Sequence, residues 1–269
     1  MTNDPESQAL HLRWSYLWKR AEEFQLRGDT SGAWDVQAGS QLARDDRRSN
    51  PFQTSHACQT LIHAAVDHFH ALVQKRIETG KIHTYAEASL ARAVVEAGST
   101  AIWILGPADS RERVARSVRW NFQDMLDERS MILEVDPGRA KSIAVIKSRF
   151  DEIVAENHLI AKDLLRPIKI TGLLKDPGVV ASMGTDLPGP LQMWKVMSGL
   201  AHARRWAMLG FSNVELTPTE DEEAFAAHIS STDDRIQQLA MVAYFCAERA
   251  IELYDHRRAK VRPPGKEGA

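Results

Sequence analysis

Residues 84–106 read TYAEASLARAVVEAGSTAIWILG, and apolar side chains cover most of the circumference of a helix with this sequence. A helix that is apolar nearly all round is buried in the core of its fold. Thr84 and Glu87 form the T-x-x-E pattern of a capping box that begins the helix, and Gly106 and Pro107 end it. We therefore expect a central, buried helix here, with other helices packed around it.

Helical periodicity continues on both sides of this segment, with apolar residues at three- and four-residue steps. Further helices are expected over residues 10–28, 52–79, 110–135, 138–165, 193–202 and 232–258. Turn signals mark residues 167–190 as a loop, and residues 210–223 are polar with room for one short strand. No run alternates with period two over a useful length, which argues against a sheet. The sequence predicts an all-α fold, a single helical-bundle domain of six to seven main helices.

The amino-acid composition is that of a globular protein, and it helps to divide the chain into segments. The 269 residues are 43% hydrophobic and 26% charged, as in ordinary globular proteins, and the net charge of -2 gives no general attraction to nucleic acid. We expect an N-terminal helical extension over 1–48, the bundle domain over 49–258 and a disordered basic tail over 259–269. The two cysteines have no metal-type spacing, as is typical of buried thiols in a reducing cytosol.

The N-terminal sequence MTNDPESQAL is acidic and lacks a signal-peptide pattern. The most apolar run, AGSTAIWILGPA, is about a dozen residues long and too short to cross a bilayer. These features predict a cytoplasmic protein that makes no membrane contact.

Polar residues nevertheless form one stripe along the helix of residues 84–106. The stripe consists of Tyr85, Ser89, Arg92, Glu96, Ser99, Thr100 and Trp103. Arg92 and Glu96 are four residues apart and can pair, and we expect that pair to be largely buried. Because burial of such a pair costs several kcal/mol per ion, its presence needs a reason. Either it is structural or faces water at a groove, or the stripe lines a ligand cleft in which Arg92 and Trp103 bind and Glu96 is catalytic.

Histidines recur every seven residues on the preceding helix, at His56, His63 and His70, with Asp67 beside the last two. His63 with Asp67, or Asp67 with His70, are close enough on a helix to share a metal ion. No second cluster of carboxylates completes a di-metal site of the bundle type. We therefore favour histidines that line a groove, with His63 in contact with a ligand, and we expect no metal and no other cofactor.

Arginines crowd the first turns of the helix over 110–135, at Arg111, Arg113, Arg116 and Arg119. The helix dipole disfavours cations at this end by about 0.3–1 kcal/mol each. Something acidic should therefore face them. It is either Glu96 together with other acidic residues of the chain, or a phosphate-bearing ligand bound by Arg113 and Arg116, because arginine is suited to bidentate phosphate contacts.

The stretch MWKVMSGLAHARRWAML, residues 193–209, places Ser198 and His202 one helical turn apart, with Arg204 following. A serine hydrolase would need better geometry, an acid behind the histidine and a G-x-S-x-G turn. We instead expect this helix end to contribute Ser198, His202 and Arg204 to a polar cleft. His202 would transfer a proton there together with Glu96, and Arg113 would lie in the same cleft.

Three stretches in this order carry a resemblance: HAAVDHFHAL, LARAVVEAGSTAIWILGPADSRERVAR and MWKVMSGLAHARRWAML. Together they resemble an uncharacterised, mostly actinobacterial family of helical proteins loosely related to the HEPN superfamily. The likeness covers residues 53–130 and 189–258. It implies a HEPN-like helical bundle and, because such folds commonly pair through helices, a homodimer. The first helix, with Trp14 and Trp18 one turn apart, would offer the aromatic surface for that pairing.

HEPN ribonucleases carry an arginine followed after four to six residues by a histidine. Arg76 with His83 and Arg249 with His256 have this spacing, but an apolar residue follows the arginine in both cases, unlike the active versions. The resemblance therefore implies nucleotide or RNA binding as readily as cleavage.

Two functions from different classes follow. The first is a HEPN-like protein whose polar cleft, lined by arginine and histidine, binds a nucleotide or RNA, with or without catalysis. The alternative is a non-enzymatic helical interaction module in which these groups form a buried structural network. A metal-dependent hydrolase that uses the histidine row is a third reading.

Overall fold

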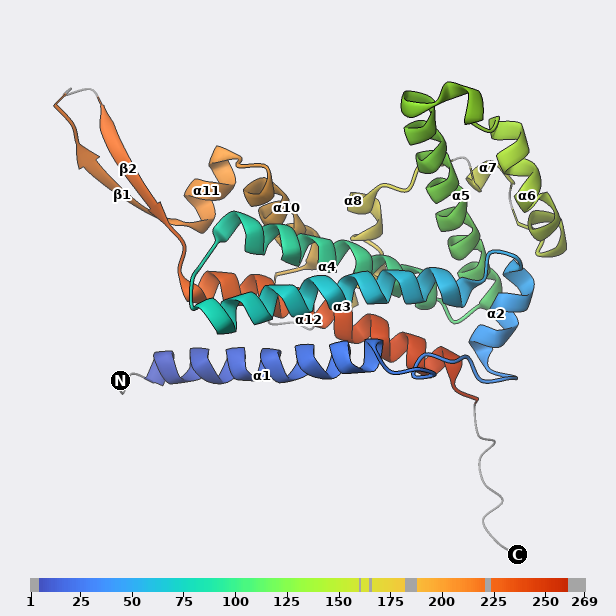
Figure 1. Ribbon diagram of the computed structural model, residues 1–269, viewed down its shortest axis with the longest axis horizontal. Coiled ribbons are helices and arrows are strands. Elements are labelled where there is room, and N and C mark those ends of the chain that lie inside the picture. The colour runs from blue at the N-terminus through green and yellow to red at the C-terminus, as the bar shows by residue number, and fades with distance from the viewer. Residues whose placement is uncertain (1–4, 160, 165, 182–187, 221–223, 261–269) are drawn as a thin grey trace, which may run out of the picture. The chain divides into compact units, whose positions relative to one another are not determined.

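The computed structural model describes residues 5–159, 161–164, 166–181, 188–220 and 224–260, and most of them are helical (Figure 1). The long helices are α1 (Pro5–Gly28), α2 (Gln41–Ser49), α3 (Thr54–Thr79), α4 (Thr84–Leu105), α5 (Ser110–Val135), α6 (Ile143–Glu156), α10 (Pro190–Ala201) and α12 (Asp233–Arg258). The short ones are the 3-10 helix η1 (Pro137–Arg139), α7 (Ala161–Leu164), α8 (Ile170–Leu173), α9 (Pro177–Val180) and α11 (Arg205–Phe211). The expectation of an all-α fold is confirmed at this level.

One β-hairpin interrupts the helices. Strands β1 (Asn213–Pro218) and β2 (Phe225–Ser230) pair antiparallel as a two-stranded sheet. The sequence led us to expect one short strand in this region, and β2 was missed. The expected disordered tail falls mostly on residues 261–269, which lie outside the described residues.

Local polar residues begin the helices. Ser40 and Ser142 accept hydrogen bonds from the third residue beyond them, at the starts of α2 and α6, and Asp109 accepts one from the Arg111 N–H at the start of α5. At α4 the carboxylate of Glu87 accepts the backbone N–H of His83 at 3.0 Å, whereas the Thr84 hydroxyl donates to Ser231. The predicted capping pattern is thus used by its glutamate alone.

The chain divides into two compact units. Unit 1 comprises Met1–Ala33, His63–Ser99 and Val180–Arg249, and unit 2 comprises Trp34–Ile62, Thr100–Val179 and Ala250–Ala269. Boundaries between the units fall inside α9 and inside α3, α4 and α12, and the sequence predicts the last three as continuous helices. No change of composition marks these boundaries along the chain.

In unit 1, α4 and α12 approach closely at Gly98. A Cβ atom at this position would lie 2.9 Å from the backbone carbonyl of Cys246, so the contact requires glycine. The rings of Phe24, Phe69 and Tyr244 pack together beside it, with centroids 6.0–6.3 Å apart. Helix α4 is long and apolar enough to cross a membrane, but 67% of its most apolar window is buried within the fold. This burial is what we expected of a central core helix.

The tryptophans of α1 contact other residues of the same chain. Trp14 is 4% exposed, its indole N–H donates to Asp233 at 3.0 Å, and the Arg76 guanidinium lies over its ring. Trp18 packs against the His70 ring. Both tryptophans therefore pack against residues of the same chain, so they do not support a dimer contact through α1. The homodimer itself stays a prediction.

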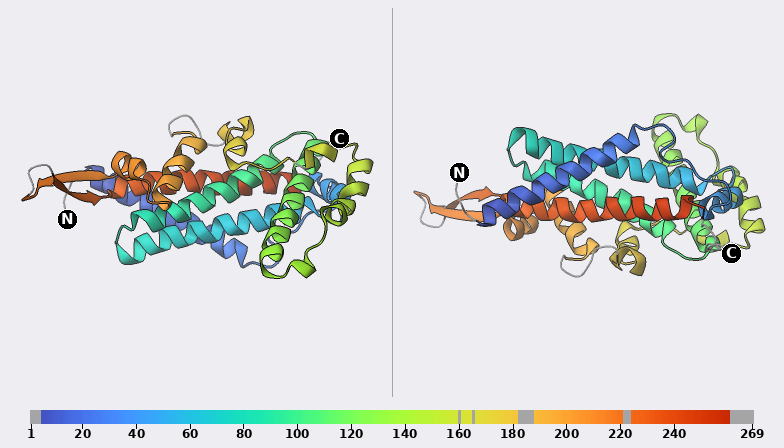
Figure 2. Two further views of the ribbon diagram at one scale, coloured as in Figure 1. Left: turned by 90° about the horizontal axis from the view of Figure 1, so that it is seen from above. Right: turned by 90° about the horizontal axis from the view of Figure 1, so that it is seen from below.

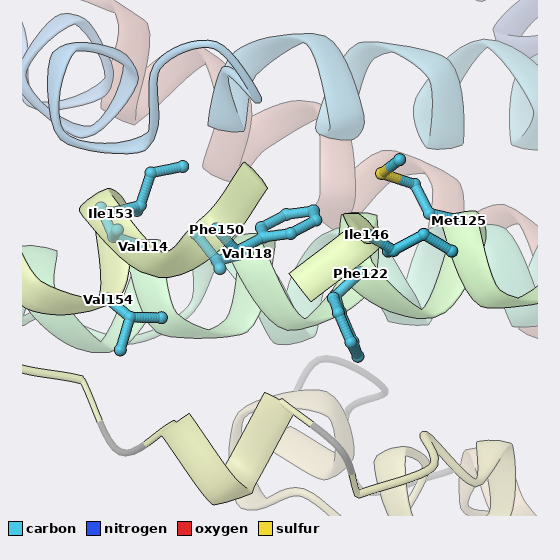
Figure 3. Packing of buried hydrophobic residues seen from close by; sticks show 8 residues of the cluster. All are labelled: Val114, Val118, Phe122, Met125, Ile146, Phe150, Ile153 and Val154. Carbon is cyan, nitrogen blue, oxygen red and sulfur yellow. The ribbon is translucent and has the colours of Figure 1, made fainter. Parts of the chain in front are cut away.

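Unit 2 has its own apolar core between α5 and α6 (Figure 3). Phe150 stands at its centre, stacked on Phe52 with centroids 4.2 Å apart and in edge contact with Phe122 at 5.3 Å. Val114 and Val118 lie on the same face of α5 and are fully buried. This packing fixes the start of α5, where the arginines lie, against α6.

Candidate functional site

The predicted pair on α4 forms, but it is only half-buried. The Arg92 Nε donates to the Glu96 carboxylate at 2.7 Å, and the two side chains are 27% and 35% exposed. The expectation of a pair is confirmed, and the expectation of deep burial is wrong. The reason is that the first half of the stripe, with Tyr85 and Ser89, is exposed, so the pair lies beside a solvent-facing part of α4.

This pair joins two residues of the 193–209 stretch within unit 1. The Trp194 indole N–H donates to the same Glu96 oxygen at 2.6 Å, and the Arg92 guanidinium lies 5.5 Å from the Trp194 ring centroid. The Arg92 Nη1 and the His202 Nε2 are 3.1 Å apart. Because a guanidinium only donates, this bond requires a neutral imidazole with its proton on Nδ1. Arg92 thus holds one histidine tautomer on an exposed surface.

The turn after α10 positions His202. Its backbone N–H donates to the Ser198 carbonyl at 3.1 Å, and Ala203 follows with a positive φ of 50° that ends the helix. Ser198 therefore contributes its backbone to this turn. The side chains of His202 and Arg204 are exposed. Gly199 allows α11 to pack, because a Cβ there would meet the Ala207 side chain at 2.6 Å.

The arginines of α5 have different roles in unit 2. Arg113 is 1% exposed, and its Nε and Nη2 donate to the two carboxylate oxygens of Asp45 at 2.6 and 3.0 Å. Its Nη1 donates to the carbonyls of Pro107 and Ala108 at 2.9 and 2.8 Å. The ligand contact that we expected from Arg113 is replaced by a buried ion pair, because Asp45 is the acidic group that faces it.

Arg116 is also engaged by protein groups. Its Nε donates to Glu112 at 2.9 Å, and its Nη1 lies 3.1 Å from Asp176 and donates to the Trp103 carbonyl at 2.8 Å. The guanidinium lies over the Trp103 ring, 5.2 Å from its centroid. Acidic residues of the chain therefore neutralise part of the cationic cluster. This was one of the two alternatives that the sequence left open.

An open pocket of about 690 Å³ lies at the start of α5, and we call it the arginine pocket. Its lining is contributed by three segments: Arg44, Arg47 and Arg48 of α2, Ser110 and Arg111 of α5, and Glu156, Asn157 and His158 at the end of α6. Four guanidinium groups thus face one carboxylate. Among the described contacts, the side chains of Arg44 and Arg47 have no hydrogen bond or ion pair.

Hydrogen bonds hold the wall of the arginine pocket. Arg48 Nη1 donates to the Ser110 hydroxyl at 2.8 Å, and that hydroxyl donates to Asp45 at 2.5 Å. The Asn157 amide donates to the Arg48 carbonyl at 2.9 Å, and Arg111 donates to the His158 carbonyl. The buried Asp45–Arg113 pair therefore continues through Ser110 to the pocket surface.

A second pocket of about 520 Å³ shares Arg111 and His158 with the first, and we call it the tryptophan pocket. Half-buried Trp103 and Arg116 line it. Its other lining residues are Asp109, Glu112, Ala115, Arg119, Leu159, Asp163 and Arg166. Three carboxylates offset its four arginines, so it is much less cationic than the arginine pocket.

Sequence reasoning missed the arginines of α2. They stand in the run RDDRRS, where Asp45 and Asp46 make the composition look neutral. At about 100° per residue, however, Arg44, Arg47 and Arg48 fall on one face of a helix, away from the acids. Burial raises the pKa of Asp46, whose carboxylate accepts the Ser55 backbone N–H at 2.8 Å.

The histidine row lies on the surface of α3. His63 is exposed, and His70 Nε2 lies 2.8 Å from Glu22. In the part of the chain that the structure describes, no three histidine, cysteine or acidic residues gather as metal ligands. Arg76 of the ribonuclease-like spacing is paired through two hydrogen bonds with Asp233, at 2.8 and 2.6 Å.

Ligand-binding and catalytic candidates thus fall into two groups. Arg92, Glu96, Trp194 and His202 meet in unit 1, whereas Arg116, Trp103 and the arginine pocket belong to unit 2. Comparisons of this chain with known protein families, with curated proteins and with solved structures find no match.

Proposed function

We propose that the chain binds the phosphate groups of a nucleotide or RNA in the arginine pocket. The observation that carries the proposal is the gathering of four guanidinium groups around one open pocket with a single carboxylate. Arg44 and Arg47 have no protein partner among the described contacts, so their charge is available to a ligand. Guanidinium groups that line one pocket repel each other, and a bound anion would reduce that repulsion.

The chemistry of the lining suits phosphate. Arginine offers paired N–H groups that match two phosphate oxygens, and the hydrogen bond from Arg48 to Ser110 limits the rotation of one of these side chains. The pocket also lies at the start of α5, a helix of 26 residues, where the dipole favours an anion. The arginine side chains and the helix dipole therefore both favour a phosphate group in this pocket.

The tryptophan pocket supports a ligand that carries a base as well as phosphate. Trp103 offers an aromatic ring in a pocket whose charges nearly cancel, and bases stack on such rings for about 1–3 kcal/mol each. Because Arg111 and His158 line both pockets, one ligand can place its phosphates among the arginines and its base beside Trp103. A HEPN-like identity would agree with such a ligand.

Catalysis is a separate proposal and rests on the unit 1 group. Arg92, whose charge Glu96 balances, contacts the His202 imidazole on an exposed surface, and an imidazole is a common proton-transfer group in catalysis. Incubation of end-labelled RNA with wild type and His202→Ala tests it. Cleavage that persists in the variant would exclude His202 from the reaction.

The alternative function, an interaction module with a structural polar network, has its own support. Arg113 and Asp45 are buried in unit 2, and the largely buried Arg257 donates to the carbonyls of Leu105 and Pro107. Such residues stabilise a fold without any ligand. The two functions differ in whether exposed Arg44 and Arg47 bind anything.

The test is fluorescence anisotropy with a labelled single-stranded RNA of about ten nucleotides, repeated with a labelled ATP analogue. Arg44→Ala/Arg47→Ala should weaken RNA binding at least tenfold. It should also make the negative slope of log K against log salt less steep by about 1.4, since each phosphate contact on a single strand contributes about 0.7. The matched control is Arg139→Ala/Arg149→Ala, which removes the same charge from exposed positions outside the pocket. Equal losses in the two double variants would refute a specific site, and no binding by wild type would leave the interaction module.

A further inference from the structure

The β-hairpin of unit 1 has one apolar and one polar face. In the observed register, Val214, Leu216 and Pro218 of β1 pair with Ile229, Ala227 and Phe225 of β2. Because side chains alternate across a strand, these six residues share one face. The other face carries Asn213, Glu215 and Thr217 opposite Ser230, His228 and Ala226. The hairpin is therefore amphipathic along its whole length.

The apolar face is open to solvent. Leu216 is 63% exposed, Phe225 60% and Ile229 37%. Figures 1 and 2 show the hairpin extending away from α11 and α12 of the same unit. A two-stranded hairpin alone in water is marginally stable at best, and it becomes stable when its apolar face is covered. This face therefore needs an occupant.

The sizes of the side chains point to the same face of another copy. On β1 the larger Leu216 stands between the smaller Val214 and Pro218, whereas on β2 the small Ala227 stands between the larger Ile229 and Phe225. Large and small residues thus alternate in both directions. We propose that this apolar face packs against the identical face of a second chain, about a two-fold axis parallel to the strands.

Such an axis places β1 of one copy over β2 of its partner. Leu216 then faces the partner's Ala227, and Phe225 faces the partner's Pro218, so each large side chain lies over a smaller one. Two small sheets stacked in this way lie about 10 Å apart, as in a β-sandwich. An isologous contact of this kind closes at two copies.

The charge of residues 213–230 argues against a membrane or a nucleic acid as the occupant. This segment contains five acidic residues and no lysine or arginine. Amphipathic elements that bind membranes usually carry basic residues on the polar face, and nucleic acid also requires them. The acidic residues of two copies repel each other, so raising the salt concentration should strengthen the dimer.

Light scattering on the full chain after size exclusion tests the proposal. Wild type at about 50 μM and 0.5 M salt should have twice the chain mass of 30.2 kDa. Leu216→Glu places a charge in the centre of the contact and should raise the dimer dissociation constant on the order of 100-fold. Thr217→Glu, one residue away on the opposite face, is the matched control and should stay dimeric. A monomeric wild type, or a dimeric Leu216→Glu, would overturn the proposal.

Mixing two variants tests the axis. Ala227→Lys should also be monomeric alone, because the lysine meets the partner's Leu216. When the Leu216→Glu chain is mixed with the Ala227→Lys chain, the new acidic and basic groups face each other and a heterodimer should form. A mixture that stays monomeric while wild type dimerises would overturn this register. Circular dichroism of each variant checks that the helices remain folded.

Discussion

Loss of the Arg113 side chain should be among the most damaging single changes in unit 2. Arg113→Ala removes two hydrogen bonds to Asp45 and two to backbone carbonyls, and it leaves a fully buried carboxylate with Ser110 as its remaining side-chain donor. Removing one partner of a buried pair costs about 3–5 kcal/mol. For a chain of this size, 1 kcal/mol corresponds to about 2–4 °C in Tm, so the expected loss is roughly 6–20 °C.

Arg92→Ala is the matched comparison. Its pair with Glu96 has a similar Nε–oxygen distance, 2.7 Å, but the two side chains are 27% and 35% exposed. Water screens such a pair, which is worth about 0–1 kcal/mol, so the loss in Tm should stay below about 4 °C. Thermal melts followed by circular dichroism measure both. Equal losses, or a loss below about 2 °C for Arg113→Ala, would refute the assignment of the buried charge.

A double-mutant cycle isolates the stranded carboxylate. In the wild type, Asp45→Asn should destabilise, because Arg113 then loses its counter-charge. In the Arg113→Ala background the same change should restore stability, because it removes a buried unpaired charge. If Asp45→Asn lowers the Tm in both backgrounds, the carboxylate is not the source of the penalty.

Two further predictions concern packing and pH. Gly98→Ala should cost about 1–3 kcal/mol because its Cβ would lie 2.9 Å from the Cys246 carbonyl, whereas Gly210→Ala, with nothing within 4 Å, should gain about 0.5–1 kcal/mol in urea unfolding. Burial raises the folded-state pKa of Asp46, so its contribution to stability falls as pH rises from the unfolded pKa through the raised one. Asp46→Asn, whose amide oxygen can still accept from Ser55, should therefore be more stable than wild type near pH 7, with no gain below about pH 3. A gain that is independent of pH would contradict the titration.

The buried helix could be predicted because its signal is local. Apolar residues cover most of the circumference over 84–105, which predicts a largely buried helix, and the spacing of Arg92 and Glu96 is enough to predict that they pair. Their exposure could not be predicted in the same way, because it depends on what packs against the stripe. Asp45 and Arg113 are 68 positions apart, and no periodicity connects them. Only the fold brings that aspartate to the arginines of α5.

The second strand had a weak signal. In β1, Val214 and Leu216 alternate with Glu215 and Thr217, which is a clear period of two. In β2 an alanine stands on each face, Ala227 on the apolar face and Ala226 on the polar face. These alanines make the period of two hard to recognise in the sequence. The register between the strands, not the sequence of either one, reveals the common apolar face.

The sequence groups the arginines at the start of α5 into one cluster, but two arginines that are two residues apart on a helix, such as Arg111 and Arg113, cannot point to the same place. At about 100° per residue, Arg113 lies about 200° around the axis from Arg111. When one of them faces the core, where Asp45 of α2 neutralises it, the other must face outward. Arg111 therefore lines the pocket beside Arg44, Arg47 and Arg48, and the buried pair that fixes α2 to α5 also fixes the spacing of the exposed charges. Stability and the proposed anion binding in unit 2 consequently depend on different arginines of the same helix.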